Sequence, residues 1–142
     1  MSVAVRVTPS TRVADLSGVD YLVGDAMTLA ALAGVTDRVG LMIEVDVATA
    51  APFTVARRLA TLDHLSAGRA GVLLHGGPHG RAEEFAAVVE ALWSGWVHGT
   101  APSTIRRIDH RGPHFEVSGM PTLPAGPRER PAVVFDEERL GL

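Results

Sequence analysis

The sequence contains neither cysteine nor lysine. Without cysteine there can be no disulfide framework, no thiolate nucleophile and no cysteine-ligated zinc or iron–sulfur centre. Because all 13 basic residues are arginine, Schiff-base chemistry and a P-loop lysine are excluded as well. The aromatic content of 5% leaves few platforms for base stacking, and the net charge of −3 gives no basic footprint. Nucleic acid is therefore not an expected partner.

Long apolar runs are also missing. No stretch approaches the roughly 20 uninterrupted residues of a membrane-spanning helix, so we expect no membrane association. The opening residues, MSVAVRVTPS, lack the charged and apolar regions of a secretory signal, and the expected location is the cytoplasm. A chain of 142 residues with 46% hydrophobic content is expected to fold as one domain spanning residues 1–142.

Apolar strand patterns alternate with helical ones along most of the chain. The sequence predicts strands at 2–7, 19–25, 39–47, 70–77 and 131–135, and helices at 26–38, from 52 to a C-cap at 67–68, and at 81–96. The link between the first two strands holds only about one turn of helix. Repeated strand–helix–strand units predict a parallel sheet of about five strands with helices outside. Residues 97–130 read as an irregular excursion containing a hairpin around Arg111-Gly112-Pro113.

Three segments carry a family resemblance: LAALAGVTDRVGL, then ARRLATLDHLSAGRAG with the following RAEEFAAVVEALWSGW, then IDHRGPHFEVSGMPTLPAGPRERPAVV. They resemble the luciferase-like flavin-dependent monooxygenases, in the branch of nitrilotriacetate and dibenzothiophene-sulfone monooxygenases. The resemblance covers roughly residues 19–135 and is most specific between Ala56 and Trp96. It implies a truncated (β/α)8 barrel of the TIM type, with reduced FMN at the carboxyl ends of the strands and a separate reductase supplying the flavin.

Three features that face the flavin in this family differ here. The strand that commonly reads Trp-Asn-Val-Val-Thr-Ser ends here in His75-Gly76-Gly77, which removes the amide. Ala50-Ala51-Pro52 replaces an aromatic-His-Pro entry to the next helix, and the usual long excursion between Asp25 and Thr28 is missing. The resemblance therefore implies an FMN site that is weak or lost, and we expect no metal.

The candidate catalytic residues are His75 and Asp25, which end two predicted strands where such folds place their chemistry. A histidine there suits acid–base work at neutral pH, although a solvated loop histidine is the plainer interpretation. Glu44 and Asp46 are weaker candidates. Gly76, Gly77 and His79 are the candidate cofactor-binding residues, in a Gly-rich loop before a helix. That loop lacks the Gly-x-Gly-x-x-Gly spacing, which favours an ordinary loop.

Other polar and aromatic residues have structural interpretations. Asp63 and His64, near a helix end, are expected to cap and pack at the opposite face of the barrel. The charges around Asp109 and His114 are expected to be solvated. Trp93 and Trp96 are expected in the core or at an interface rather than against flavin.

Three functional hypotheses remain open from the sequence. The first is a small flavin-associated oxidoreductase or monooxygenase acting on a small molecule. The second is a flavin-free enzyme that uses His75 and Asp25 for proton transfer. The third is a non-catalytic subunit that pairs with a full-length relative. Because part of a barrel would leave two unpaired strand edges and an inner apolar layer in water, a homodimer or a full-length relative is the expected partner.

Overall fold

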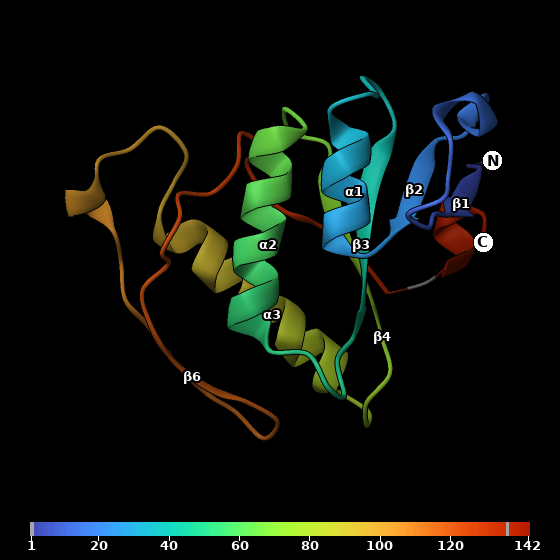
Figure 1. Ribbon diagram of the computed structural model, residues 1–142. Coiled ribbons are helices and arrows are strands. Elements are labelled where there is room, and N and C mark those ends of the chain that lie inside the picture. The colour runs from blue at the N-terminus through green and yellow to red at the C-terminus, as the bar shows by residue number, and fades with distance from the viewer. Residues whose placement is uncertain (1, 136) are drawn as a thin grey trace.

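The computed structural model describes residues 2–135 and 137–142 and shows a five-stranded parallel sheet with helices packed on one face (Figure 1). The strand order is β1-β2-β3-β4-β7. These strands are β1 (Ala4–Arg6), β2 (Tyr21–Gly24), β3 (Gly40–Asp46), β4 (Ala70–His75) and β7 (Ala132–Val134). The α-helices are α1 (Ala26–Ala33), α2 (Pro52–Leu65) and α3 (Arg81–Gly95). The predicted α/β architecture with about five parallel strands is confirmed.

The main core lies between the sheet and these helices. Alternate residues of the central strands, such as Leu41 and Ile43 on β3, pack there against Leu59 of α2 and Phe85 of α3. Pro52 occupies the first turn of α2, where its missing N–H costs nothing, and positive φ angles at Ala67 and Gly68 end the helix as predicted. Among the described residues no helix has the combination of length and apolarity needed to cross a bilayer.

Some predicted elements are shorter than the sequence suggested. The link between β1 and β2 contains only the 3-10 helix η1 (Val13–Leu16), with Leu16 buried. Helix α1 ends at Ala33 because Gly34 is its C-cap, so the predicted continuation to residue 38 is wrong. Leu65 was expected on the buried face of α2, but it lies at the last turn and is 57% exposed.

The inner face of the sheet, opposite the helices, has a small core of its own. Val23, Met42 and Leu73 pack there with Leu140 from the 3-10 helix η3 (Glu137–Leu140), and all four are buried. The expectation that this layer faces water is therefore wrong for its centre. β1 and β7 remain the edge strands of the sheet.

The hairpin of β5 (Ile108–Arg111) and β6 (Glu116–Gly119) is attached to the start of α3. The carboxylate of Glu84 accepts hydrogen bonds from the backbone N–H groups of His114 and Phe115, and it lies 3.2 Å from His110 Nε2. Burial raises the pKa of Glu84, but the hydrogen bonds from His110 and these N–H groups outweigh it, so the net shift is downward. Arg81 stacks on the Phe115 ring at 4.2 Å.

Asp63, near the end of α2, is fully buried and accepts only backbone hydrogen bonds. Its Oδ1 accepts from the Ala70 N–H at 3.1 Å and its Oδ2 from the Arg128 N–H at 3.0 Å. Trp93 is buried as well, and its indole N–H donates to the carbonyl of Arg128. Trp93 is therefore a core residue. The predicted structural role of Asp63 is confirmed.

Replacing Asp63 with Ala leaves two buried N–H groups without acceptors, and we expect it to lower the free energy of unfolding by about 3 kcal/mol. Asp63→Asn keeps one acceptor oxygen and is expected to cost less. Urea denaturation followed by circular dichroism measures both. Asp37→Asn, at an exposed position, is the control and is expected to change stability by less than about 0.5 kcal/mol. An Asp63→Ala protein as stable as this control would contradict the role.

Candidate functional site

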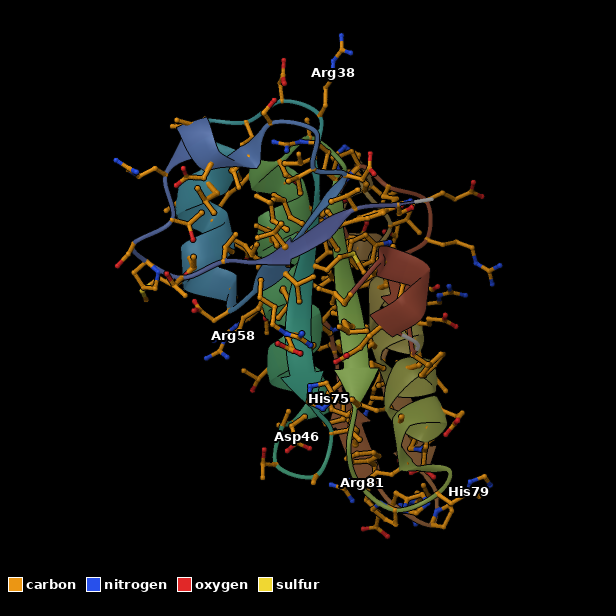
Figure 2. The ribbon with its side chains drawn as sticks, turned by 90° about the vertical axis from the view of Figure 1, so that its right-hand side faces the viewer. Arg38, Asp46, Arg58, His75, His79 and Arg81 are labelled. Atoms are coloured by element: carbon orange, nitrogen blue, oxygen red, sulfur yellow. The ribbon has the colours of Figure 1, made fainter. Side chains whose placement is uncertain are left out.

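The carboxyl ends of the parallel strands gather polar side chains at one edge of the sheet. His75 ends β4 and stands in register with Asp46, the last residue of β3, and both lie at the same end of the molecule (Figure 2). Side chains alternate along a strand, so Glu44 shares the inner face with Met42, and His75 shares it with Leu73. This is the end at which barrels and open α/β sheets place their active sites.

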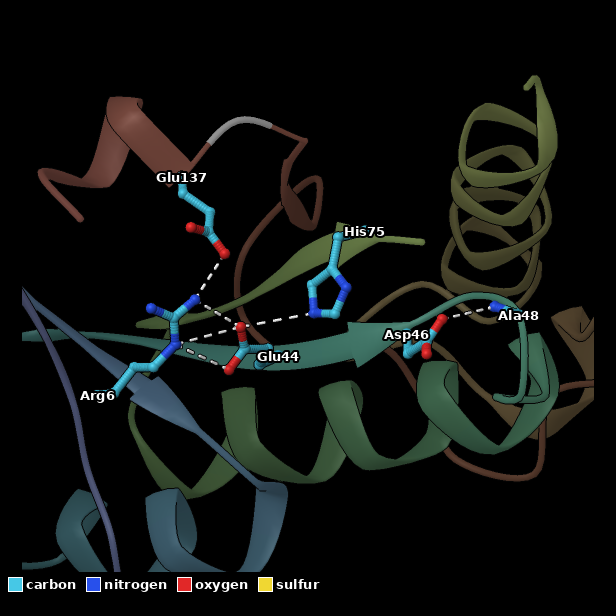
Figure 3. A network of polar contacts seen from close by, with 6 residues as sticks. All are labelled: Arg6, Glu44, Asp46, Ala48, His75 and Glu137. Atoms are coloured by element: carbon cyan, nitrogen blue, oxygen red, sulfur yellow. Dashed lines mark hydrogen bonds and ion pairs between the residues drawn. The ribbon is translucent and has the colours of Figure 1, made fainter. Parts of the chain in front are cut away.

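Glu44 is the centre of the polar network at this edge (Figure 3). Its carboxylate accepts hydrogen bonds from the Arg6 guanidinium, the shortest at 2.8 Å, and Oε2 also lies 3.5 Å from His75 Nε2. Glu137 of η3 accepts a further hydrogen bond from Arg6, at 2.6 Å. The His75 side chain is 42% exposed and that of Glu44 is 26% exposed. Glu44 thus contacts one permanent cation and one titratable ring.

The charge of Glu44 is fixed by its neighbours. The hydrogen bonds from Arg6 lower the pKa of Glu44 below its ordinary value, and they outweigh the opposing effect of partial burial. The same contacts raise the pKa of Arg6. Glu44 therefore stays anionic beside His75 across the neutral pH range, which favours a protonated imidazole whenever the ring takes up a proton.

Asp25 has a local structural role as well as a place at this edge. As the N-cap of α1 it accepts from the backbone N–H of Thr28 at 2.8 Å and from its hydroxyl at 2.9 Å. These hydrogen bonds lower the pKa of Asp25. Asp25 also lines a cleft of about 160 Å³ together with Glu44, Asp46 and Arg58. The structure thus brings Asp25 to the same cleft as Glu44, while the described carboxylate contact of His75 is to Glu44.

The Gly-rich loop after β4 is packed against protein atoms. Gly76 has φ +83° and lies against the Asp46 carboxylate, where any Cβ would collide with Oδ1. Gly77 lies similarly close to Arg81 and Val47. The Asp46 carboxylate in turn accepts from the Ala48 N–H at 2.9 Å. Both glycines are thus explained by close packing within the chain.

FMN would bring a phosphate, and the residues at this edge do not fit one. A phosphate on the loop of Gly76, Gly77 and His79 would meet the carboxylate of Asp46, and like charges repel. The nearby cation of Arg6 is already paired with Glu44 and Glu137. The described residues also contain no group of three or more histidine, aspartate or glutamate side chains placed to hold a metal ion.

The sequence pointed to this edge but did not single out Arg6. The available signal was the alternation of the first strand, which puts Arg6 on the inner face with Ala4. The sequence also favoured Asp25 over Glu44, although Glu44 is the residue that joins Arg6 to His75. His64 lies away from this edge, and its Nε2 contacts the Pro124 carbonyl at 2.9 Å.

Comparison with known proteins agrees with the geometry of the sheet. Residues 11–77 match the family model described as Luciferase-like monooxygenase. One of the two subunits of pristinamycin IIA synthase from Streptomyces pristinaespiralis is 36% identical over 118 residues, which cover 73% of this chain and 43% of that protein. Nitrilotriacetate monooxygenase component A from Aminobacter aminovorans is 33% identical over 136 residues, covering 75% of this chain and 30% of that protein. The chain thus spans less than half the length of these relatives.

Solved structures show the same fold. EDTA monooxygenase from Chelativorans sp. BNC1 superposes with a TM-score of 0.69 at 24% identity, over 81% of this chain and 38% of that one. A riboflavin lyase determined with a modified FMN also gives a TM-score of 0.69, at 23% identity, over 81% of this chain and 39% of that one. The sheet and its helices therefore correspond to part of a TIM-type barrel, and the chain belongs to the luciferase-like monooxygenase family.

Proposed function

We propose that this chain is a component of a luciferase-like oxidoreductase acting on a small molecule, to which it supplies the proton-transfer pair His75 and Glu44. One observation carries the proposal: a single anionic carboxylate contacts both Arg6 and a half-exposed histidine, on the inner face at the carboxyl ends of the strands. Asp25 is the weaker second candidate, because its carboxylate is engaged by Thr28. In this proposal residues 1–142 act as one unit in the cytoplasm.

The chemistry of the pair follows from its contacts. His75 presents Nε2 to Glu44, which leaves Nδ1 without a partner among the described residues. A proton taken up by the ring from a substrate is stabilised by the adjacent carboxylate, and the same ring can return it as a general acid. Arg6 keeps Glu44 ionised and in place. His75 is therefore the acid–base residue, and Glu44 and Arg6 are positioning residues.

The flavin phosphate, in this proposal, is held outside the described residues. Support comes from the acidic character of this edge, where the cleft offers Arg58 as its one cation among the described lining residues. A second copy of this chain, or a full-length relative, would complete the site across the edge strands β1 and β7. The two pristinamycin IIA synthase relatives are themselves named as subunits.

We expect His75→Ala to reduce turnover by about a hundredfold or more with an unchanged melting temperature, because an exposed acid–base group carries catalysis but little packing energy. Reduced FMN from a flavin reductase and NADH would be offered with nitrilotriacetate and dibenzothiophene sulfone, and the products measured by mass spectrometry. His64→Ala is the matched control. It is expected to lose about 1 kcal/mol of stability, with its hydrogen bond to Pro124, and to retain turnover.

Full activity in the His75→Ala protein would overturn the assignment of the acid–base residue. Absence of product from the wild-type chain with every substrate, alone and with a full-length relative, would overturn the oxidoreductase proposal and favour a non-catalytic subunit.

Weak binding of FMN by the isolated chain is a second expectation, because the Gly76 loop faces a carboxylate instead of a phosphate-binding group. Quenching of flavin fluorescence is expected to show no sub-micromolar site. Riboflavin, which lacks the phosphate, is the control and should bind within about threefold of FMN. Sub-micromolar binding with a strong preference for FMN would show that a phosphate site exists in this chain.

The edge strands lead us to expect a homodimer at micromolar concentration. Light scattering should give twice the chain mass of 15.0 kDa. Val3, beside β1, is 47% exposed, and Val3→Arg should shift the protein toward monomer because it places a charge at the edge. Met27→Arg alters a more exposed apolar side chain on α1 and should leave the dimer intact. A wild-type protein that stays monomeric at all concentrations would exclude this partner.

A further inference from the structure

The opposite end of the inner face, where the strands begin, is hollow. A cavity of about 490 Å³ opens there, lined by Tyr21, Gly40, Arg38, Arg69 and Arg128 among others. A second cavity of about 200 Å³ shares four of these residues and continues inward to Met42, Val134 and Leu140. The two form one recess, polar at the mouth and apolar at depth. Arg38 at its rim and His75 at the candidate site lie at opposite ends of the molecule (Figure 2).

Small residues create this recess. Gly40 stands in register with Tyr21 on the neighbouring strand, and the Tyr21 ring lies across it: a Cβ at Gly40 would be 2.6 Å from Tyr21 Cδ1. Ala132 of β7 also lines the inner cavity. Because neither Gly40 nor Ala132 fills the inner face, the aromatic ring of Tyr21 forms a flat wall between the two cavities.

The charge of the recess is positive, although the whole chain carries −3. Arg69 donates all of its side-chain hydrogen bonds to neutral oxygens: the carbonyls of Ser66, Val39, Ala33 and Thr36, and the Thr36 hydroxyl. Its charge is therefore fixed in place without a described acidic partner. Asp20 is the one acidic residue among the described lining residues, and its carboxylate accepts from the Val3 N–H at 2.8 Å.

Arg128 is held by its backbone while its side chain stays available. Its N–H donates to Asp63 and its carbonyl accepts from the Trp93 indole, so its Cα is anchored to the core. Within residues 2–135 and 137–142, neither the Arg128 nor the Arg38 guanidinium has a described hydrogen bond or ion pair. Each offers a planar fork of donors, which matches a carboxylate or phosphate.

We propose that this recess binds a small organic anion, a carboxylate or phosphate carried on a flat apolar body. Arg128 and Arg38 bind the anionic group, and Arg69 adds a fixed positive charge beside it. The apolar body lies against Tyr21 and reaches toward Met42 and Val134. The site is separate from His75 and Glu44, so its occupation does not depend on the proposed oxidoreductase activity.

Phenyl phosphate, benzoate and inorganic phosphate would be titrated at constant ionic strength into the 15N-labelled chain. Saturable shifts of the Tyr21 and Gly40 amide signals are expected with the two aromatic anions. Inorganic phosphate should bind at least about tenfold more weakly, because it cannot use the Tyr21 wall. Benzyl alcohol, uncharged and of similar shape, should not bind. The tighter of phenyl phosphate and benzoate identifies the anionic group.

Arg128→Gln should weaken binding of the tighter anion by about tenfold or more, and Arg38→Gln should weaken it as well, since each removes a charged donor. Arg58→Gln, which removes an arginine at the other end of the sheet, is the control and should leave the affinity unchanged. The melting temperature of each variant would show that it is folded, and Arg38, at an exposed position, keeps the test valid if Arg128→Gln is unstable.

Three outcomes would overturn the proposal. These are the absence of saturable binding by either aromatic anion, affinities that do not respond to Arg128→Gln and Arg38→Gln, and equal binding of inorganic phosphate and phenyl phosphate.

Discussion

The buried carboxylate of Asp63 determines how the last strand of the sheet is placed. It joins the end of α2 to the start of β4 through Ala70, and both to the segment before β7 through Arg128. β7 itself pairs with β4 over only three residues, so its position depends on this anchor as well as on the ladder. Through β7 the anchor also fixes η3, which covers the inner apolar layer with Leu140 and contacts Arg6 with Glu137.

The two ends of the inner face carry opposite charge. Carboxylates of Asp25, Glu44 and Asp46 gather where the strands end, whereas three arginines surround the recess where the strands begin. Because the apolar layer of Val23, Met42 and Leu73 lies between them, the two polar regions do not share side chains. A ligand that suits one end is therefore repelled from the other, which allows the two ends to select different molecules.

The sequence was informative wherever local rules decide the structure. Continuous apolar runs such as that of β4 predicted buried strands, and Pro52 and Gly68 marked the limits of α2, because these signals depend only on neighbouring residues. The N-cap role of Asp25 was within the same reach, since its partner Thr28 is three residues away. Contacts between distant segments could not be predicted in this way. Arg6 meets Glu44 only because β1 and β3 lie on either side of β2, and the pairing depends on the register of all three strands. The sequence therefore located the candidate edge through His75 but could not say which carboxylate would contact it.

The neighbouring position of β4 and β7 also has a kinetic consequence. The whole of α3 and the β5–β6 hairpin lie between these two strands in the chain, so pairing them closes a long loop for only three residues of ladder. The entropy of closing that loop must be met before the short ladder contributes any stability. We therefore expect β1 to β4 to assemble first, with β7 joining last and opening first, so that exchange of its amide protons reports the loosest part of the sheet.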